Sequence, residues 1–191
     1  MNMKWLLSSL IFLVSAVAFA QSQVAPPPKP ADDGQTIEAT MKFIEDKLNA
    51  IGRVDIVVYL HDGVTGTDWS NKRTWEISKV VADPKTCFMK YHYKWIHVGQ
   101  VLRDNDITLG FKWVRSIAVT PMDPLLHNAD AKAGHPERSE RSVPPVFVLV
   151  AKFANGNNQQ FEFFDESMAN RVAKAMARAA ELCGGGSVAP F

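Results

Sequence analysis

Residues 87–95 read CFMKYHYKW, and this stretch decides the class of fold. Apolar or aromatic side chains occupy every second position, and the positions between them hold Phe88 and three polar residues, Lys90, His92 and Lys94. A strand places successive side chains on opposite faces of its sheet, so the stretch predicts a strand with one dry face and one wet face. The dry face holds Cys87, Met89, Tyr91, Tyr93 and Trp95.

The wet face of the same strand carries Lys90, His92 and Lys94. With Lys72 and Arg73 nearby, these side chains offer a basic surface for an anionic lipid or polysaccharide. The alternative is the outer face of an edge strand, where lysine discourages aggregation. We prefer this second interpretation and keep the three residues as candidate ligand or partner contacts.

Similar patterns extend along the chain on both sides of this strand. Apolar spacings of three and four after Thr36 predict a helix that ends at Gly52, and a second such stripe after Asp165 predicts a helix that ends at Gly184. Between them, alternating or apolar segments predict strands near residues 54–60, 74–81, 107–119, 146–153 and 160–164, with polar turns at 62–68 and 103–106. The sequence therefore predicts an α+β fold of mainly antiparallel strands. We expect about six to seven strands in a small barrel or sandwich, closed by the C-terminal helix and preceded by an N-terminal helix.

Residues 1–20 have the features of a cleavable signal peptide. Lys4 precedes an apolar run that ends in Ala18-Phe19-Ala20, a small-x-small cleavage site. Residues 21–35 contain four prolines, which favours an extended tether, and residues 36–191 would form one domain with a flexible tail at 184–191. We therefore expect a periplasmic or secreted protein with no membrane-spanning segment after cleavage.

Composition excludes several classes of function. The chain has 191 residues and a formal net charge of +1, so it lacks the basic surface that nucleic-acid binding requires. Two cysteines are too few for a disulfide-dense miniprotein or a multi-cysteine metal site. The five histidines are scattered and residues 62–68 do not match a calcium loop, so we expect no metal and no cofactor.

The second half of the chain resembles a pleckstrin-homology-like domain. The resemblance consists of residues 111–119 (FKWVRSIAV), the strand at 147–150, the Asn155-Gly156 turn, residues 161–165 (FEFFD) and the terminal helix. Residues 165–186 also look like the ending of a family of exported bacterial proteins of uncharacterised function. The resemblance implies a helix that plugs one end of a barrel; it implies no activity and no lipid-binding residue.

Cys87 and Cys183 are the strongest pair of functional-group residues. Disulfides persist in the compartments outside the cytoplasm, and the cysteine count is even. Cys87 lies on the dry face of its strand, and Cys183 ends the apolar stripe of the helix that should cover this core. We expect a disulfide between them; two separate buried thiols are the alternative.

No catalytic motif is present, so we expect no catalytic residue to be identifiable from the sequence. Residues 121–145 read as a long polar connection, and His135, Glu137 and Arg138 within it form a small cluster of candidate contacts. The tryptophans at 69, 75, 95 and 113 are expected in the core, with a sugar-stacking platform as the lesser alternative. We predict a non-catalytic domain that binds a peptide or an envelope protein along a strand edge or beside the last helix. The alternative is an enzyme with its site around residues 121–145.

Overall fold

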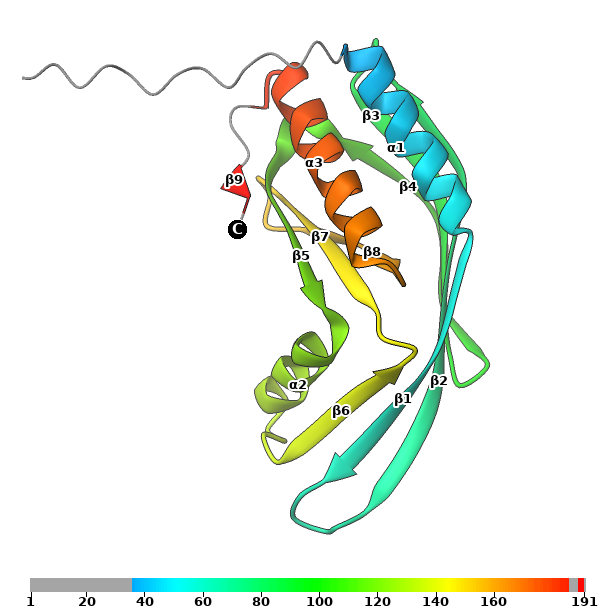
Figure 1. Ribbon diagram of the computed structural model, residues 1–191, viewed down its shortest axis with the longest axis vertical. Coiled ribbons are helices and arrows are strands. Elements are labelled where there is room, and N and C mark those ends of the chain that lie inside the picture. Colours follow the sequence, from blue (N-terminus) through cyan, green and yellow to red (C-terminus); the bar gives the residue numbers. More distant parts are fainter. Residues whose placement is uncertain (1–35, 186–188, 191) are drawn as a thin grey trace, which may run out of the picture. The chain divides into compact units, whose positions relative to one another are not determined.

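The computed structural model of the protein describes residues 36–185 and 189–190, so the predicted signal peptide and tether lie outside it. These residues form an α+β fold with mainly antiparallel strands, which confirms the predicted class (Figure 1). The elements are α1 (Ile37–Ile51), β1 (Arg53–Asp62), β2 (Asp68–Asp83), β3 (Phe88–His97), β4 (Gln100–Gly110), the 3₁₀ turn η1 (Phe111–Trp113), β5 (Val114–Pro121), α2 (Met122–Lys132), β6 (Arg138–Val143), β7 (Phe147–Phe153), β8 (Asn158–Phe163), α3 (Glu166–Leu182) and β9 (Ala189–Pro190).

The strands form two open sheets, so the barrel alternative of the predicted small barrel or sandwich is wrong. One sheet has the order β4-β3-β2-β1-β6, and the other has the order β8-β7-β5-β9. The chain leaves β4 at Gly110 and passes through η1 before β5 begins, so β4 and β5 belong to different sheets. Two residues of the predicted tail, Ala189 and Pro190, pair in parallel with β5.

Strand β7 is the centre of the structure because both of its faces are buried. Leu149 and Ala151 face the core that α1 and α3 share with both sheets. Val148 and Val150 face a separate core formed with β1 and Met122 of α2. This double burial explains why β7 reads as a nearly continuous apolar run rather than an alternating one.

The two long helices lie where the apolar spacing predicts them. Thr36 Oγ1 accepts a hydrogen bond from Ala39 N at 3.2 Å, and Asp165 Oδ1 accepts one from Met168 N at 3.2 Å, so both helices have a side-chain N-cap. Helix α1 packs on β2 and on α3, and α3 packs on the sheet of β5, β7 and β8. Their buried stripes include Met41, Ile44 and Leu48 on α1 and Val172, Met176 and Ala179 on α3.

Cys87 and Cys183 form a disulfide, with their sulfur atoms 2.11 Å apart and their Cα atoms 5.8 Å apart. The bond ties the start of β3 to the end of α3 across 96 residues of sequence. Closing a loop of this length stabilises the fold by about 4.7 kcal/mol in the chain-entropy account.

Residues 103–106, predicted as a turn, lie inside β4. The reversal between β3 and β4 instead occurs at Val98 and Gly99, whose φ angles are +49° and +79°. Two adjacent positive φ angles suit the twist of a two-residue hairpin loop. The polar side chains at 103–106 reflect an exposed strand at the edge of the sheet rather than a turn.

The predicted loop at 121–145 is also wrong, because it contains α2 and β6. Pro124 lies in the first turn of α2, where a backbone N–H has no helical partner to lose. Strand β6 has the sequence RSERSV, which lacks the alternation of apolar and polar residues that predicts a strand. Neither element shows the regular apolar spacing that predicts a helix or a strand.

The tryptophans divide between core and surface. Trp75 is 9% exposed, as expected for the core, but Trp69 is 37% exposed and Trp113 is 42% exposed. The placement of Trp69 and Trp113 in the core is therefore wrong. At Trp113 the reason is η1, which breaks the strand alternation that the apolar pattern of residues 107–119 suggests.

Glu162 on β8 is a carboxyl group enclosed between the two sheets, and it is 6% exposed. Its side chain borders a cavity of about 10 Å³, the size that one water molecule needs, together with Trp75 and Tyr93 of the other sheet. Burial raises the pKa of Glu162 from 4.5 to about 8, although a hydrogen bond with its own backbone opposes this shift. The carboxyl group therefore holds its proton at neutral pH.

We predict that Glu162 makes the folded state less stable as pH rises. The folded pKa lies above the unfolded value, so the folded state binds the proton more tightly and its stability falls between about pH 4.5 and about pH 8. Glu162→Gln should remove this loss and stabilise the protein by roughly 2–4 kcal/mol at pH 8. Urea unfolding at pH 5, 6.5 and 8 measures the effect, with the exposed Glu38→Gln as control. Equal pH slopes for the wild type and Glu162→Gln would contradict it.

Candidate functional site

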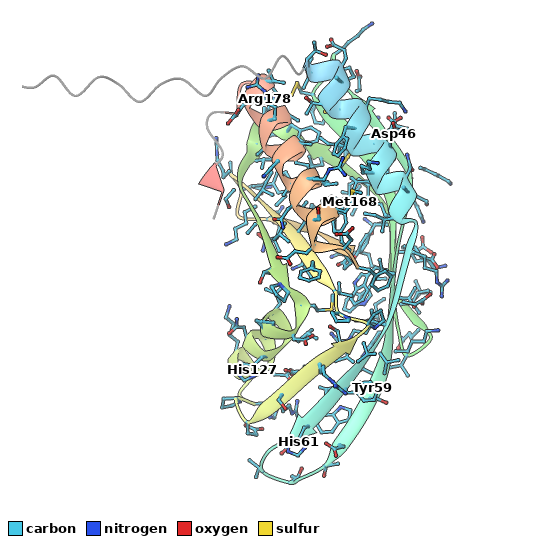
Figure 2. All side chains as sticks on the ribbon, viewed as in Figure 1. Asp46, Tyr59, His61, His127, Met168 and Arg178 are labelled. Atoms are coloured by element: carbon cyan, nitrogen blue, oxygen red, sulfur yellow. A yellow bond between two sulfur atoms is a disulfide. The ribbon has the colours of Figure 1, made fainter. Side chains whose placement is uncertain are left out.

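The two edges of the five-stranded sheet differ in how their backbone groups are satisfied. Helix α2 covers the β6 edge: His127 Nδ1 donates to the Arg138 carbonyl oxygen at 2.8 Å, and Ser142 N donates to Asp123 Oδ1 at 2.8 Å. The Ser142 hydroxyl donates to the same Asp123 oxygen at 2.6 Å. Figure 2 shows His127 on α2, beside β6. The helix thus occupies backbone positions that another strand would need.

Strand β4 is the opposite edge, and it is open. It runs for eleven residues, and among the described residues only β3 pairs with it. All seven residues from Gln100 to Asp106 are exposed, including Val101 at 47% and Leu102 at 46%. An edge strand of this kind presents unpaired N–H and C=O groups to which an extended peptide can bond.

A groove of about 410 Å³ adjoins the C-terminal end of β4. Thr108 and Gly110 of β4 line one side, and Phe153, Asn157 and Gln159 of the β7–β8 hairpin line the other. The groove therefore lies at the seam between the two sheets. No charged side chain lines it, and its size falls in the range of ordinary ligand sites.

Trp113 projects into this groove and is held in place by its neighbours. A Cβ atom at Gly110 would lie 2.3 Å from Trp113 Cε3, so only glycine allows the indole to lie against the backbone there. Phe88 meets the indole edge-on at 5.5 Å, and the Trp113 carbonyl accepts a hydrogen bond from Ala154 N at 2.9 Å. Lys112 Nζ lies 4.5 Å from the ring centroid. The result is a positioned yet 42% exposed aromatic side chain.

The predicted basic surface lies on the outer face of β3, where acidic residues of β4 neutralise part of it. His92 lies 3.0 Å from Asp104 through Nε2 and 3.0 Å from Asp106 through Nδ1. Lys94 Nζ lies 3.9 Å from Asp104. Lys90 is exposed on the same strand. These contacts join β3 to β4 and leave little net positive charge.

The other predicted cluster lies where the α2–β6 connection enters β6. His135 Nδ1 is 3.3 Å from Glu137 Oε1, and the Arg138 guanidinium lies 5.4 Å from the centroid of the Trp69 ring. Strands β2 and β1 separate β3 from β6 in the sheet. The structure therefore does not bring this cluster together with Lys90, His92 and Lys94.

Asp130 of α2 and Glu140 of β6 form a carboxyl pair that the sequence did not suggest. Burial, followed by the contact with Asp130, raises the pKa of Glu140 from 4.5 to about 7. Both Glu140 oxygens are buried without a hydrogen-bond donor among the described residues, and the neighbouring carboxyl group of Asp130 further disfavours the charged form of Glu140. Glu140 lies opposite the buried Leu60 of β1, which places its side chain on the inner face of the sheet. The sequence could have suggested this position only if residues 138–143 had been recognised as a strand.

Comparisons with known proteins do not extend this description. No family model, curated protein or solved structure matches the chain. Within residues 36–185 and 189–190, no three His, Cys, Asp or Glu side chains are placed to hold a metal ion. No helix in the same ranges has the length and apolar character needed to cross a membrane.

We predict that Gly110 and Trp113 are energetically coupled. Gly110→Ala would place a methyl group against the indole and should destabilise the fold by about 1–3 kcal/mol, as overpacking does. Trp113→Ala removes the clash, so the glycine substitution should cost much less in that background. Denaturant unfolding of the two single variants and the double variant measures the coupling. Additive effects would contradict the proposed contact.

Proposed function

We propose that the protein is an exported, non-catalytic binding domain that accepts a peptide segment of an envelope or secreted partner as an added strand on β4. One observation carries the proposal: β4 is a long, open edge strand that ends at the groove containing Trp113. Backbone hydrogen bonds along β4 would supply affinity, and the groove would supply selectivity.

The chemistry of the groove indicates the kind of side chain that it would accept. Trp113 offers aromatic surface, while Thr108, Asn157 and Gln159 offer hydroxyl and amide groups. Gln159 Oε1 already accepts a hydrogen bond from the Tyr91 hydroxyl at 3.1 Å, so its amide N–H groups are the part left for a ligand. With no charge in the lining, a neutral apolar or aromatic side chain of the peptide fits best.

The contrast with β6 supports β4 as the binding edge. Helix α2 occupies the β6 edge through His127 and Asp123, and no comparable contact covers residues 100–106 among the described elements. Val101 and Leu102 add exposed apolar side chains that a partner strand could cover.

The cellular location and the family resemblance are parts of the same proposal. The Cys87–Cys183 disulfide is compatible with a periplasmic or secreted protein, in agreement with the signal-peptide pattern of residues 1–20. The order β7, β8 and α3 supports a distant pleckstrin-homology-like character in the second half of the chain.

A second candidate is an enzyme whose site includes the segment 121–145. The Asp130–Glu140 pair favours it, because a carboxyl group with a pKa near 7 suits general acid–base chemistry. A screen of ester, peptide and glycoside substrates with the wild type and Glu140→Gln separates this function from binding alone.

Selection from a random peptide library against the full exported chain tests the binding function. We expect extended peptides that carry a large neutral side chain, and we expect Trp113→Ala or Thr108→Lys to weaken their binding about tenfold or more. Trp69→Ala and Val64→Lys are matched controls, because both residues are exposed but lie outside the groove and β4. A selection that yields no peptide, or peptides that bind both groove variants as tightly as the wild type, would overturn the proposal.

A further inference from the structure

Residues 103–108 are the regular part of the open β4 edge. The register of β4 against β3 is continuous from Thr108 back to Arg103, and it then shifts so that the pairing skips Leu102. A β-bulge of this kind bends its strand and interrupts regular pairing. An added strand would therefore pair in regular register with residues 103–108, which lead into the groove at Trp113.

Two charged side chains of this segment lie on opposite faces of the sheet. Arg103 lies opposite Trp95 of β3, whose side chain packs against the core, so Arg103 is on the inner face. Asp106 lies opposite His92, on the outer face. Side chains alternate along a strand, so positions three residues apart always differ in face. A partner strand would meet a positive charge on one face and a negative charge on the other.

Both charges are available to a partner. Arg103 is exposed and forms no ion pair with a carboxylate among the described residues. The Asp106 side chain is 88% exposed, and within the same residues its only ion-pair contact is with His92 Nδ1 at 3.0 Å. Asp104, by contrast, lies within 4.0 Å of both His92 and Lys94. Arg103 and Asp106 are therefore the charges that this edge offers to an added strand.

The same charges disfavour pairing between two copies of β4. In antiparallel pairing about a two-fold axis, residues directly opposite each other lie on the same face. A pairing centred on Arg103 would place two guanidinium groups opposite each other, and one centred on Asp104 or Asp106 would place two carboxylates there. A pairing centred on Asn105 would place Asp104 opposite Asp106. Like charges directly opposite each other destabilise a sheet, so a different chain with complementary charges fits this edge better.

We propose that the partner segment carries a basic side chain opposite Asp106 and an acidic side chain opposite Arg103. This inference rests on the proposed function, because it names the partner of the same β4 edge. Antiparallel pairing is slightly more stable per residue than parallel pairing, so the segment runs from the groove toward Arg103. Its order is then a large neutral residue opposite Thr108, a basic residue two positions later, and an acidic residue three positions after that.

The two charges would select the partner by rejection as well as by attraction. A neutral segment would cover Arg103 and Asp106 without supplying an opposite charge to either. A segment with its acidic and basic residues exchanged would place like charges opposite both of them. Specificity is a difference of affinities, so a repulsive pair in the wrong complex contributes as much as an attractive pair in the right one.

Two peptides of identical composition and net charge test the inference. The matching peptide is Phe-Val-Lys-Thr-Thr-Glu-Thr, and the exchanged peptide is Phe-Val-Glu-Thr-Thr-Lys-Thr. We expect fluorescence anisotropy with the full exported chain to show about tenfold tighter binding of the matching peptide, because two cross-strand pairs change from opposite to like charge in the other. The double variant Arg103→Glu/Asp106→Lys should reverse this preference. Both substituted side chains are exposed, and circular dichroism checks that the variant folds.

The double variant Arg141→Glu/Asp68→Lys is the matched control, because it makes the same exchange of charge at exposed positions on β6 and β2. It should keep the preference of the wild type. Trp113→Ala should weaken both peptides alike, since the groove contributes no charge.

The outcomes separate this inference from the proposed function. Equal affinity of the wild type for the two peptides, or an unreversed preference in Arg103→Glu/Asp106→Lys, would overturn the charge assignment. If Trp113→Ala still weakened both peptides in that case, strand addition at β4 would stand. Failure of both peptides to bind would also overturn the charge assignment, and the random-library selection decides independently whether the edge binds peptides at all.

Discussion

The hydrogen-bonding demand of exposed sheet edges governs this structure. Two open sheets leave edge strands whose outward N–H and C=O groups need partners or water. Helix α2 meets the demand at β6 through His127 and Asp123, and the two-residue β9 covers part of β5. Strand β4 has no such cover among the described elements. In the five-stranded sheet, one edge is therefore open to strand pairing and the other edge is covered.

The rest of the fold keeps that open edge in a defined place. The disulfide ties the start of β3 to the end of α3, and the Cys87 carbonyl accepts a hydrogen bond from Phe111 N at 3.0 Å in η1. Phe88, next to Cys87, supports the Trp113 indole. The covalent link, the 3₁₀ turn and the aromatic contact thus position the groove relative to β4. Rigid support of an exposed aromatic side chain lowers the entropy lost when a ligand binds.

The spacing of apolar residues predicts much of this arrangement, but it does not predict the elements that are made of polar residues. The helices α1 and α3, strand β1 and strand β3 each bury one regular face, so their periodicity is visible in the sequence. Strand β6 and the first seven residues of β4 are edge strands made mostly of polar residues, and such a sequence is read as a turn or loop.

The site was harder to predict because it depends on contacts between distant segments. The Trp113 groove joins the end of β4 to the β7–β8 hairpin, and the Asp130–Glu140 pair joins α2 to β6. The residues of the groove and of the carboxyl pair follow no regular spacing in the sequence that would predict these contacts. The sequence does not show that Gly110 makes room for the indole of Trp113.

Backbone amide hydrogen exchange tests the asymmetry between the two edges most directly. In the free protein, the amide of Ser142 should exchange slowly because it donates to Asp123, while every second amide of residues 100–106 should exchange at close to the rate of an unstructured chain. A bound peptide should slow those β4 amides and leave Ser142 unchanged. If the outward β4 amides are as protected as Ser142 in the free protein, the β4 edge is not open and the account is wrong.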